Sequence, residues 1–280
     1  MPQQSHSCKL LPDLGQRILV MGILNVTPDS FSDGGRFNDY QAALDRALTM
    51  VEQGADILDI GGESTRPGAT IVSAEEEVAR VVPIIAQLAA VVPVPISIDT
   101  YKSATARAAL EAGAEIVNDV WGLQHDPEIA NVAAEFGAPV VIMHNRKQAD
   151  PELDIIADMR RFFDVSLSIA QQAGISDNNI ILDPGIGFGK TQQQHFDILL
   201  RLDELKAFGF PVLIGASRKS MIGNIVQRPP QERMAGSLAV HTLAAANGAD
   251  IIRAHDVAEH VDSARIVDAF NRYRPESTQT

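Results

Sequence analysis

Short apolar runs rich in β-branched residues alternate along this chain with segments of helical periodicity. A glycine stands just before several of these runs, in the pairs Gly54-Ala55, Gly113-Ala114, Gly137-Ala138, Gly209-Phe210 and Gly248-Ala249. A left-handed glycine that ends a helix directly before a strand produces this pattern. The eight runs expected to form strands are Ile18–Leu24, Asp56–Ile60, Pro95–Ile98, Glu115–Val117, Pro139–Met143, Ile180–Leu182, Pro211–Ile214 and Asp250–Ala254.

Strands and helices that alternate with short links predict parallel strands joined by right-handed crossovers. Eight such units in 280 residues favour a single (β/α)8 TIM barrel, with a doubly wound open sheet as the alternative. We expect the barrel over residues 17–272, an N-terminal extension over residues 1–16 and a flexible tail over residues 273–280, with both ends mobile. Ser73 followed by Glu76 resembles a capping box that opens a helix.

Composition excludes several classes of function. The formal net charge of −13 and the isoelectric point near 4.9 argue against a nucleic-acid partner, which needs a basic face. An anionic small substrate stays possible, because a site can be locally basic within an acidic protein. The single cysteine, Cys8, rules out an internal disulfide and a cysteine-based metal cluster. No signal segment or membrane-length apolar run is present, which predicts a soluble, cytoplasmic protein.

Each expected strand is followed by polar residues that a buried apolar run would not favour. In a barrel, all the carboxyl ends of the strands meet in one mouth, where the active site lies. One such residue alone would be read as a turn or cap residue, but a whole ring of them predicts a polar site. The ring consists of Asn25, Asp59 with Glu63, Asp99, Asn118, His144, Asp183, Ser217, and Arg253 with His255.

Three long connections add to this mouth. Loop one (residues 25–35) is dense in Gly, Ser and Asp, which suits either a lid or a disordered loop. Loop two (residues 61–68) combines glycines with Arg66, a planar donor for an anion. Loop seven, Gly215–Ser220, holds two adjacent cations and two hydroxyl groups where barrels often bind anions, although a solvated charge pair would look the same.

The segment Asp183–Thr191 is rich in glycine but fits no nucleotide-binding motif. A phosphate-cradling P-loop would need glycine at Pro184, and the dinucleotide fingerprint would need glycine at Lys190. Nucleotide hydrolysis is therefore not expected. A glycine-lined wall that admits a flat ring beside Asp183 is the physically better interpretation.

Taken together, seven segments resemble the dihydropteroate synthase family. They match it in order and spacing from about Ile18 to Val257, which is nearly the whole chain. The segments are GILNVTPDSFSDGG, DIGGESTRPGA, ISIDT, IVNDV, LDPGIGFGK, SRKS and IIRAHDV. In that family, 7,8-dihydropterin-6-ylmethyl diphosphate condenses with 4-aminobenzoate to give 7,8-dihydropteroate and diphosphate, a step of folate biosynthesis.

The resemblance implies roles for residues around the pterin. The catalytic residues would be Asp99, Lys219 and Arg253, with Asp99 holding a cationic pterin as diphosphate leaves. Asn118 and Asp183 would join Asp99 along the amino-pyrimidine edge, and Lys219 would meet the ring carbonyl group and a ring nitrogen. The apolar walls would be Val120, Met143 and Phe188, with the Arg253 guanidinium stacked against the ring.

The resemblance also implies a diphosphate site, a metal and a site for the amine. Asn25 would bind Mg²⁺ together with water and phosphate oxygens. The phosphates would be held by Arg66, Arg253 and His255. The residues placed for 4-aminobenzoate or along its loop are Thr65, Pro67, Gly215, Ser217, Lys219 and Ser220.

One departure from the family pattern and two alternatives complete these expectations. After His144 the family commonly has a short turn with glycine and proline, whereas here Asn145–Gln148 follows, so no catalytic residue is expected there. Arg146 and Lys147 are expected to be solvated, and His144 to be structural. A pterin-dependent methyltransferase domain and a non-catalytic pterin-binding module are the alternatives. The apolar segment Met234–Ala246 and the family resemblance predict a homodimer, and sulfonamides are expected to inhibit.

Overall fold

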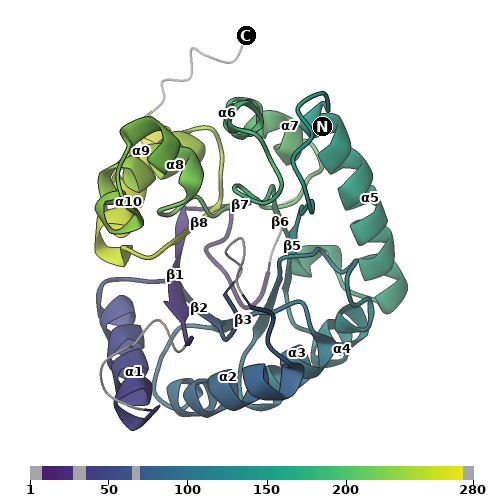
Figure 1. Cartoon of the computed structure of the whole chain (residues 1–280), viewed down its shortest axis with the longest axis vertical. Coiled ribbons are helices and arrows are strands. Elements are labelled where there is room, and N and C mark those ends of the chain that lie inside the picture. The colour runs from purple at the N-terminus through teal and green to yellow at the C-terminus, as the bar shows by residue number, and fades with distance from the viewer. Residues whose placement is uncertain (1–7, 28–35, 65–69, 274–280) are drawn as a thin grey trace.

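Eight parallel strands form an inner barrel surrounded by helices (Figure 1). The computed structural model describes residues 8–27, 36–64 and 70–273, with residues 36–39 described by their backbone alone. The strands hydrogen-bond in the order β6-β5-β4-β3-β2-β1-β8-β7, and a parallel bridge between Leu182 and Val212 closes the ring. The predicted (β/α)8 barrel is therefore confirmed. The strands are β1 (Leu19–Asn25), β2 (Ile57–Gly61), β3 (Ile96–Asp99), β4 (Ile116–Asp119), β5 (Val140–Met143), β6 (Ile180–Asp183), β7 (Leu213–Ile214) and β8 (Ile251–Ala254).

The outer layer consists of helices between successive strands, with additional short helices after β6 and β7. All five glycines expected to precede strands have positive φ, from 65° at Gly137 to 110° at Gly113. This confirms the sequence signal for the ends of the helices. The helices are α1 (Arg36–Glu52), α2 (Ala74–Ala89), α3 (Ser103–Glu111), α4 (Glu128–Phe136), α5 (Ile155–Ala173), α6 (Gln192–Leu200), α7 (Leu202–Lys206), α8 (Ser220–Val226), α9 (Met234–Ala246) and α10 (Val257–Tyr273). The described residues also include two 3-10 turns, η2 (Asp177–Asn179) and η3 (Pro230–Glu232).

Two helix starts show how side chains fix the entry of the chain. At α2 the Ser73 side chain accepts a hydrogen bond from the backbone N–H of Glu76, which is one half of the predicted capping box. At the start of α6, Thr191 and Gln194 form a capping box with both reciprocal bonds. This box was not predicted from the sequence. Each cap satisfies backbone donors that the first helical turn leaves unpaired.

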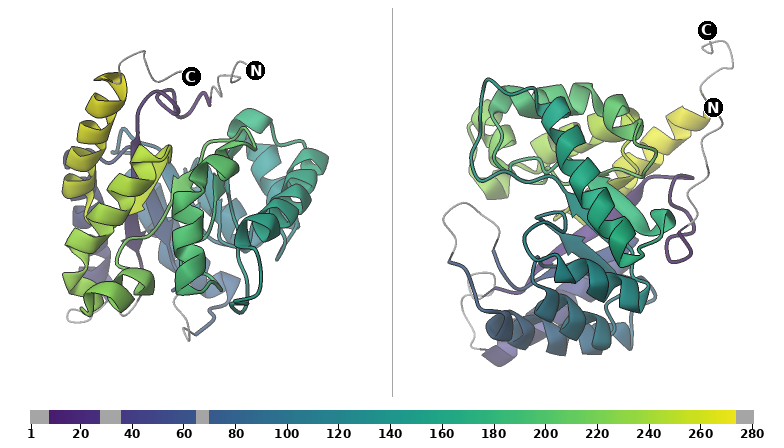
Figure 2. Two further views of the ribbon diagram at one scale, coloured as in Figure 1. Left: turned by 90° about the horizontal axis from the view of Figure 1, so that it is seen from above. Right: turned by 90° about the vertical axis from the view of Figure 1, so that its right-hand side faces the viewer.

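The N-terminal segment closes one end of the barrel. Cys8, Leu11 and Leu14 are buried and join the inner core formed by inward-facing strand residues such as Met21 and Ile57. In the left view of Figure 2 this purple segment lies at the same end of the barrel as the last turns of α10. Within residues 8–16 these apolar side chains therefore cover the starts of the strands, and the mobility expected for the extension stays a prediction. Residues 1–7 and 274–280 lie outside the described residues.

The opposite end, where the strands finish, is polar. The parallel register sets Asn25 beside Gly61, Gly61 beside Asp99, and Asp99 beside Asn118. Because side chains alternate between the two faces of a strand, this register directs Asp59, two residues before Gly61, to the same inner face. None of the helices in the described ranges is both long and apolar enough to cross a membrane.

Candidate active site

Arg253 on β8 reaches across the barrel mouth to two carboxylates. Its Nε donates to Asp59 Oδ2 at 2.6 Å, and its Nη2 donates to Asp99 Oδ2 at 2.6 Å. Asn118 Nδ2 also donates to Asp59 Oδ2, at 3.1 Å. Asp59, on β2, therefore holds Asn118 of β4 and Arg253 of β8 in one cluster. The sequence reading placed Asp59 in the polar ring but gave it no role, because its partners are distant in the chain.

Burial and charge shift the ionisation of this cluster. Burial raises the pKa of Asp99 to about 7, although Arg253 and Lys219 oppose the shift. Burial also raises the pKa of Asp183, again against Lys219. For Arg253 burial lowers the pKa, but Asp59 and Asp99 outweigh this effect, so the guanidinium pKa lies above its usual value. The mouth therefore places two cations, Arg253 and Lys219, near carboxylates whose raised pKa values disfavour ionisation. These carboxylates are Asp99 and Asp183.

Two carboxylate oxygens of the cluster are buried and have no hydrogen-bond partner among the described residues. They are Asp59 Oδ1 and Asp99 Oδ1. Nearby, Asp183 uses Oδ1 to accept a hydrogen bond from the backbone N–H of Gly185 at 2.7 Å. Buried acceptors without partners are costly, so they indicate a place for N–H donors from a ligand.

Lys219 contributes the ammonium group on the β7 side of the mouth. Its Nζ donates to the carbonyl oxygen of Ile186 and lies 4.6 Å from the ring centroid of Phe188. Burial lowers the pKa of Lys219 to about 8, although Asp183 opposes the shift. Val120 and Met143, expected as apolar walls, are both buried. Phe188 is partly exposed, as the face of a ligand pocket would be.

Loop seven divides its two cations. A Cβ atom built on Gly215 would lie 3.7 Å from Arg253 Cβ and 4.0 Å from Lys219 Nζ, so the loop starts between these two side chains. Arg218 faces away from this group and pairs with Asp256. Ser220 is exposed at the first residue of α8. Of the two adjacent cations expected in loop seven, Lys219 therefore lies at the mouth, whereas Arg218 forms an ion pair with Asp256.

Ser217 and His255 lie side by side at the ends of β7 and β8. Ser217 Oγ lies 2.9 Å from His255 Nδ1, and the backbone N–H of His255 also donates to Ser217 Oγ at 3.2 Å. The carbonyl oxygen of His255 accepts a hydrogen bond from Arg46 at 2.7 Å. These hydrogen bonds therefore fix the geometry of the pair at the ends of β7 and β8.

Glu63 was expected in the ring of polar strand ends, but it belongs to a separate network of hydrogen bonds. Its carboxylate accepts from Lys102 Nζ at 2.5 Å and from the Tyr101 hydroxyl group at 3.0 Å. Lys102 also pairs with Glu77 at 2.7 Å. The residues of loop two that the family resemblance assigned to substrates, namely Thr65, Arg66 and Pro67, lie outside the described residues, as does most of loop one.

The only protein ligand expected for a metal is Asn25, at the end of β1. Its side-chain oxygen lies 3.8 Å from a Cβ atom built on Gly61, and Asp99 Oδ2 lies 3.6 Å from the same point. Among the described residues no group of three or more His, Cys, Asp or Glu could hold a metal ion. Mg²⁺ often binds through one or two protein oxygens plus substrate phosphates, and Asn25 fits that mode of binding.

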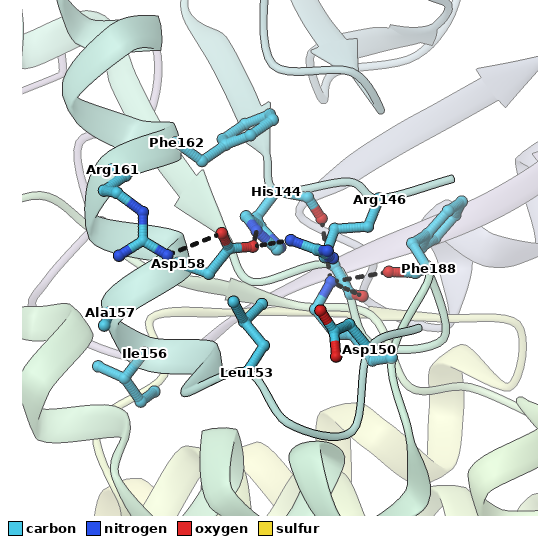
Figure 3. A network of polar contacts seen from close by, with 12 residues as sticks. His144, Arg146, Asp150, Leu153, Ile156, Ala157, Asp158, Arg161, Phe162 and Phe188 are labelled. Carbon is cyan, nitrogen blue, oxygen red and sulfur yellow. Dashed lines mark hydrogen bonds and ion pairs between the residues drawn. The ribbon is translucent and has the colours of Figure 1, made fainter. Parts of the chain in front are cut away.

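Residues of loop five (residues 144–154) and of α5 form a network of polar contacts around Asp158 (Figure 3). The Nε2 atom of buried His144 lies 3.2 Å from Asp158 Oδ2, and Arg146 donates to the same oxygen at 2.6 Å. Burial lowers the pKa of His144 to about 3, so the ring is neutral and donates to the carboxylate. The structural role expected for His144 agrees with this geometry. The expectation of a solvated Arg146 is wrong, because its guanidinium is held by Asp158.

Comparisons with known proteins show the family to which the chain belongs. The model of the pterin binding enzyme family matches residues 21–255. The dihydropteroate synthase of Clostridium beijerinckii is 46% identical over 261 residues, which cover 93% of this chain and 97% of that protein. A crystal structure of dihydropteroate synthase from Clostridium difficile, obtained with pteroic acid, is 48% identical with a TM-score of 0.90 and covers 94% of this chain and 99% of that one. The Xanthomonas albilineans enzyme with 4-aminobenzoic acid is 46% identical with a TM-score of 0.88, covering 92% and 94%. The chain therefore belongs to the pterin-binding enzymes and, within them, to the dihydropteroate synthase family.

Proposed function

We propose that this chain condenses 7,8-dihydropterin-6-ylmethyl diphosphate with 4-aminobenzoate, releasing diphosphate and forming 7,8-dihydropteroate. The observation that carries the proposal is the buried cluster at the barrel mouth, in which Asp99 presents an unpartnered oxygen beside the Arg253 guanidinium. This arrangement suits a flat heterocycle with several N–H donors on one edge. Structures of related synthases with pteroic acid and with 4-aminobenzoic acid support the same substrates.

The pterin edge is proposed to bind Asp99, Asn118 and Asp183. Their side chains are buried, so each lost hydrogen bond to a substrate would leave a polar group without a partner, and analogues lacking the donors would be rejected. Lys219 is proposed to donate to the ring carbonyl group and a ring nitrogen. Val120, Met143 and Phe188 would form the apolar walls.

The reaction is proposed to be dissociative. The C–O bond between the methylene carbon and the diphosphate breaks first, and the electron-rich pterin stabilises the resulting positive charge. Asp99 lies where it can face that charge, while Arg253 and His255 neutralise the departing diphosphate. The amine nitrogen then forms the new C–N bond and loses its proton to water. No strong general base is required, because an aromatic amine is already neutral at pH 7.

Mg²⁺ is proposed to bind Asn25 together with phosphate and water oxygens. Bound there, the ion would neutralise negative charge on the leaving diphosphate. The proposal predicts that Asn25→Ala raises the Mg²⁺ concentration needed for half-maximal activity, because one ligand is lost. Activity should partly recover at high Mg²⁺. A variant with the same metal dependence as the wild type would contradict the assignment of Asn25.

The aromatic amine is proposed to enter between loops two and seven. Thr65, Pro67, Ser217, Lys219 and Ser220 would line its path, with the carboxylate near the exposed Ser220. Sulfonamides resemble 4-aminobenzoate in shape and charge distribution, so we expect them to compete with it. Related synthases have been crystallised with sulfonamide compounds, which supports this expectation.

A homodimer through the late helices is proposed from exposed apolar side chains on two neighbouring helices. Leu243 on α9 and Phe270 on α10 are 62% and 72% exposed. Exposed apolar side chains commonly mark an association site where they form one patch. A cytoplasmic location would suit an enzyme with these small charged substrates. Light scattering at micromolar concentration tests the dimer, and a monomer under those conditions would overturn it.

A coupled assay for released diphosphate, run with and without 4-aminobenzoate, tests the proposed reaction. A synthase should release diphosphate in proportion to the amine consumed. A methyltransferase domain would release none, and a binding module would bind the pterin without turnover. Single-turnover measurements on Asp99→Asn should show a slower chemical step, and a wild-type rate would remove Asp99 from that role.

A further inference from the structure

Lys190 is buried at the end of the glycine-rich segment after β6, and the proposed mechanism does not use it. Its side chain is only 9% exposed, and its Nζ donates to three backbone carbonyl oxygens. These belong to His144 at 3.2 Å, Gly185 at 2.9 Å and Phe188 at 3.0 Å. Burial lowers the pKa of Lys190 to about 7. The three acceptors favour the ammonium form, because a neutral amine has only two N–H bonds to donate.

The segment that Lys190 holds, residues 185–190, is called here the glycine turn. Gly185 and Gly189 have φ of 67° and 58°, the left-handed region that disfavours side chains. A Cβ atom on Gly185 would overlap the carbonyl oxygen of His144, and one on Gly189 would overlap that of Arg146. The glycine turn therefore lies directly against the backbone of loop five, with the Lys190 ammonium between them.

The other side of the glycine turn faces the active site. Its Ile186 carbonyl oxygen accepts the hydrogen bond from Lys219, and its Phe188 ring lies under the same ammonium group. A Cβ atom on Gly187 would lie 3.0 Å from Lys219 Cδ, so the Lys219 side chain also packs on the turn. The backbone N–H of Gly187 donates to His195 Nε2 at 3.0 Å, which gives the turn a second anchor.

Loop five is itself fixed, so it can serve as a rigid support. His144 and Arg146, whose carbonyl groups contact the glycine turn, both bind the Asp158 carboxylate through their side chains. Arg161 adds a further ion pair to Asp158 at 3.2 Å. Figure 3 shows these side chains gathered around Asp158, with Phe188 beside them. The support for the turn thus extends from α5 through loop five.

We infer that Lys190 is a positioning residue: its ammonium group fixes the glycine turn against loop five and thereby sets the positions of Phe188 and of the Ile186 carbonyl oxygen that holds Lys219. This inference rests on the proposed function, since Phe188 and Lys219 matter there as pterin contacts. Lys190 acts through these residues and does not itself touch the substrate.

The test compares Lys190→Met with Lys190→Arg and with a matched control, Lys206→Met. Lys190→Met keeps most of the apolar stem but removes the ammonium donor from three carbonyl groups, of which that of Gly185 still accepts from the backbone N–H of Phe188. Lys190→Arg keeps the charge. Lys206 is a half-buried lysine that pairs with Asp250 at 2.6 Å, at the strand-start end of the barrel. Calorimetry would measure the dissociation constant of the pterin substrate without amine, and steady-state assays would measure kcat and KM.

For Lys190→Met we expect pterin binding at least ~10-fold weaker in the folded protein, since small displacements of contact groups have effects of this size. Lys190→Arg should recover most of the affinity, and Lys206→Met should bind like the wild type even if its melting temperature falls. A merely structural role would lower the melting temperature and leave the dissociation constant unchanged, which would overturn the inference. If Lys190→Met does not fold, Lys190→Gln takes its place, and wild-type affinity in that variant would be equally decisive against it.

Failure of the inference can be told apart from failure of the proposed function. If the wild-type chain binds no pterin and releases no diphosphate, the function itself is wrong. If the wild type binds and turns over while Lys190→Met matches it in both measurements, only the role of Lys190 is wrong.

Discussion

Asp59 offers the sharpest test of the site, because it holds two proposed pterin residues without being assigned to the pterin itself. Asp59→Asn keeps the size of the side chain but removes the negative charge that faces Arg253 Nε at 2.6 Å. The same oxygen accepts from Asn118 at 3.1 Å. Hydrogen bonds to charged groups contribute about 1.5–3 kcal/mol. If that free energy orients Arg253 and Asn118, kcat/KM for the pterin diphosphate should fall about 10- to 100-fold.

The assay is the steady-state kcat/KM of Asp59→Asn, with Asp250→Asn as its matched control. Asp250 is also a carboxylate in an ion pair, with Lys206, but lies at the opposite end of the barrel. A double-mutant cycle with Asn118→Ala should give a coupling free energy above ~0.5 kcal/mol, because the two side chains share a hydrogen bond. A folded Asp59→Asn variant within twofold of the wild type would refute this role for Asp59.

Three further outcomes follow from packing and ionisation. Leu11→Ala should lower the free energy of unfolding by about 2–5 kcal/mol in urea titrations, with kcat unchanged, because Leu11 is buried far from the mouth. Burial lowers the pKa of His144 to about 3. The unfolded chain, where histidine titrates near ~6.5, therefore binds an extra proton below that pH, and stability falls as the pH drops towards 3. Between pH 7 and pH 4, His144→Gln should lose about 3 kcal/mol less stability than the wild type; equal pH slopes would contradict a buried neutral ring. Phe270→Glu should shift the proposed dimer towards the monomer in light scattering, and an unchanged mass would argue against the α9–α10 face.

The barrel could be predicted from sequence because its signals are local. β-branched runs and the glycines before them fix where strands start, and the structure moves the predicted boundaries by only one or two residues. The packing of the N-terminal segment was not predicted because Cys8, Leu11 and Leu14 are too few to show periodicity. Their burial depends on an open barrel end, which exists only once the strands have closed.

The sequence predicted the gathering of polar residues at one end of the barrel, but not the hydrogen bonds between them. The polar strand ends converge because all eight strands are parallel, and that follows from the fold class. The pairing of Asp59 with Arg253 spans 194 positions in the chain and depends on barrel closure. In the sequence, Lys190 was notable only because it breaks a glycine motif. Its three carbonyl partners are visible only in the folded structure. Arg146 looked like a surface charge because its partner, Asp158, lies on the following helix.

Isotope tracing tests the central claim most directly. The pterin diphosphate would carry ¹⁸O in the oxygen between the methylene carbon and the diphosphate, and the 4-aminobenzoate would carry ¹⁵N in its amine. We expect one ¹⁸O in every released diphosphate and one ¹⁵N in every 7,8-dihydropteroate, in equal amounts, since the C–O bond breaks and the C–N bond forms. Recovery of ¹⁸O on a hydroxymethyl pterin, or diphosphate release without incorporation of ¹⁵N, would contradict it.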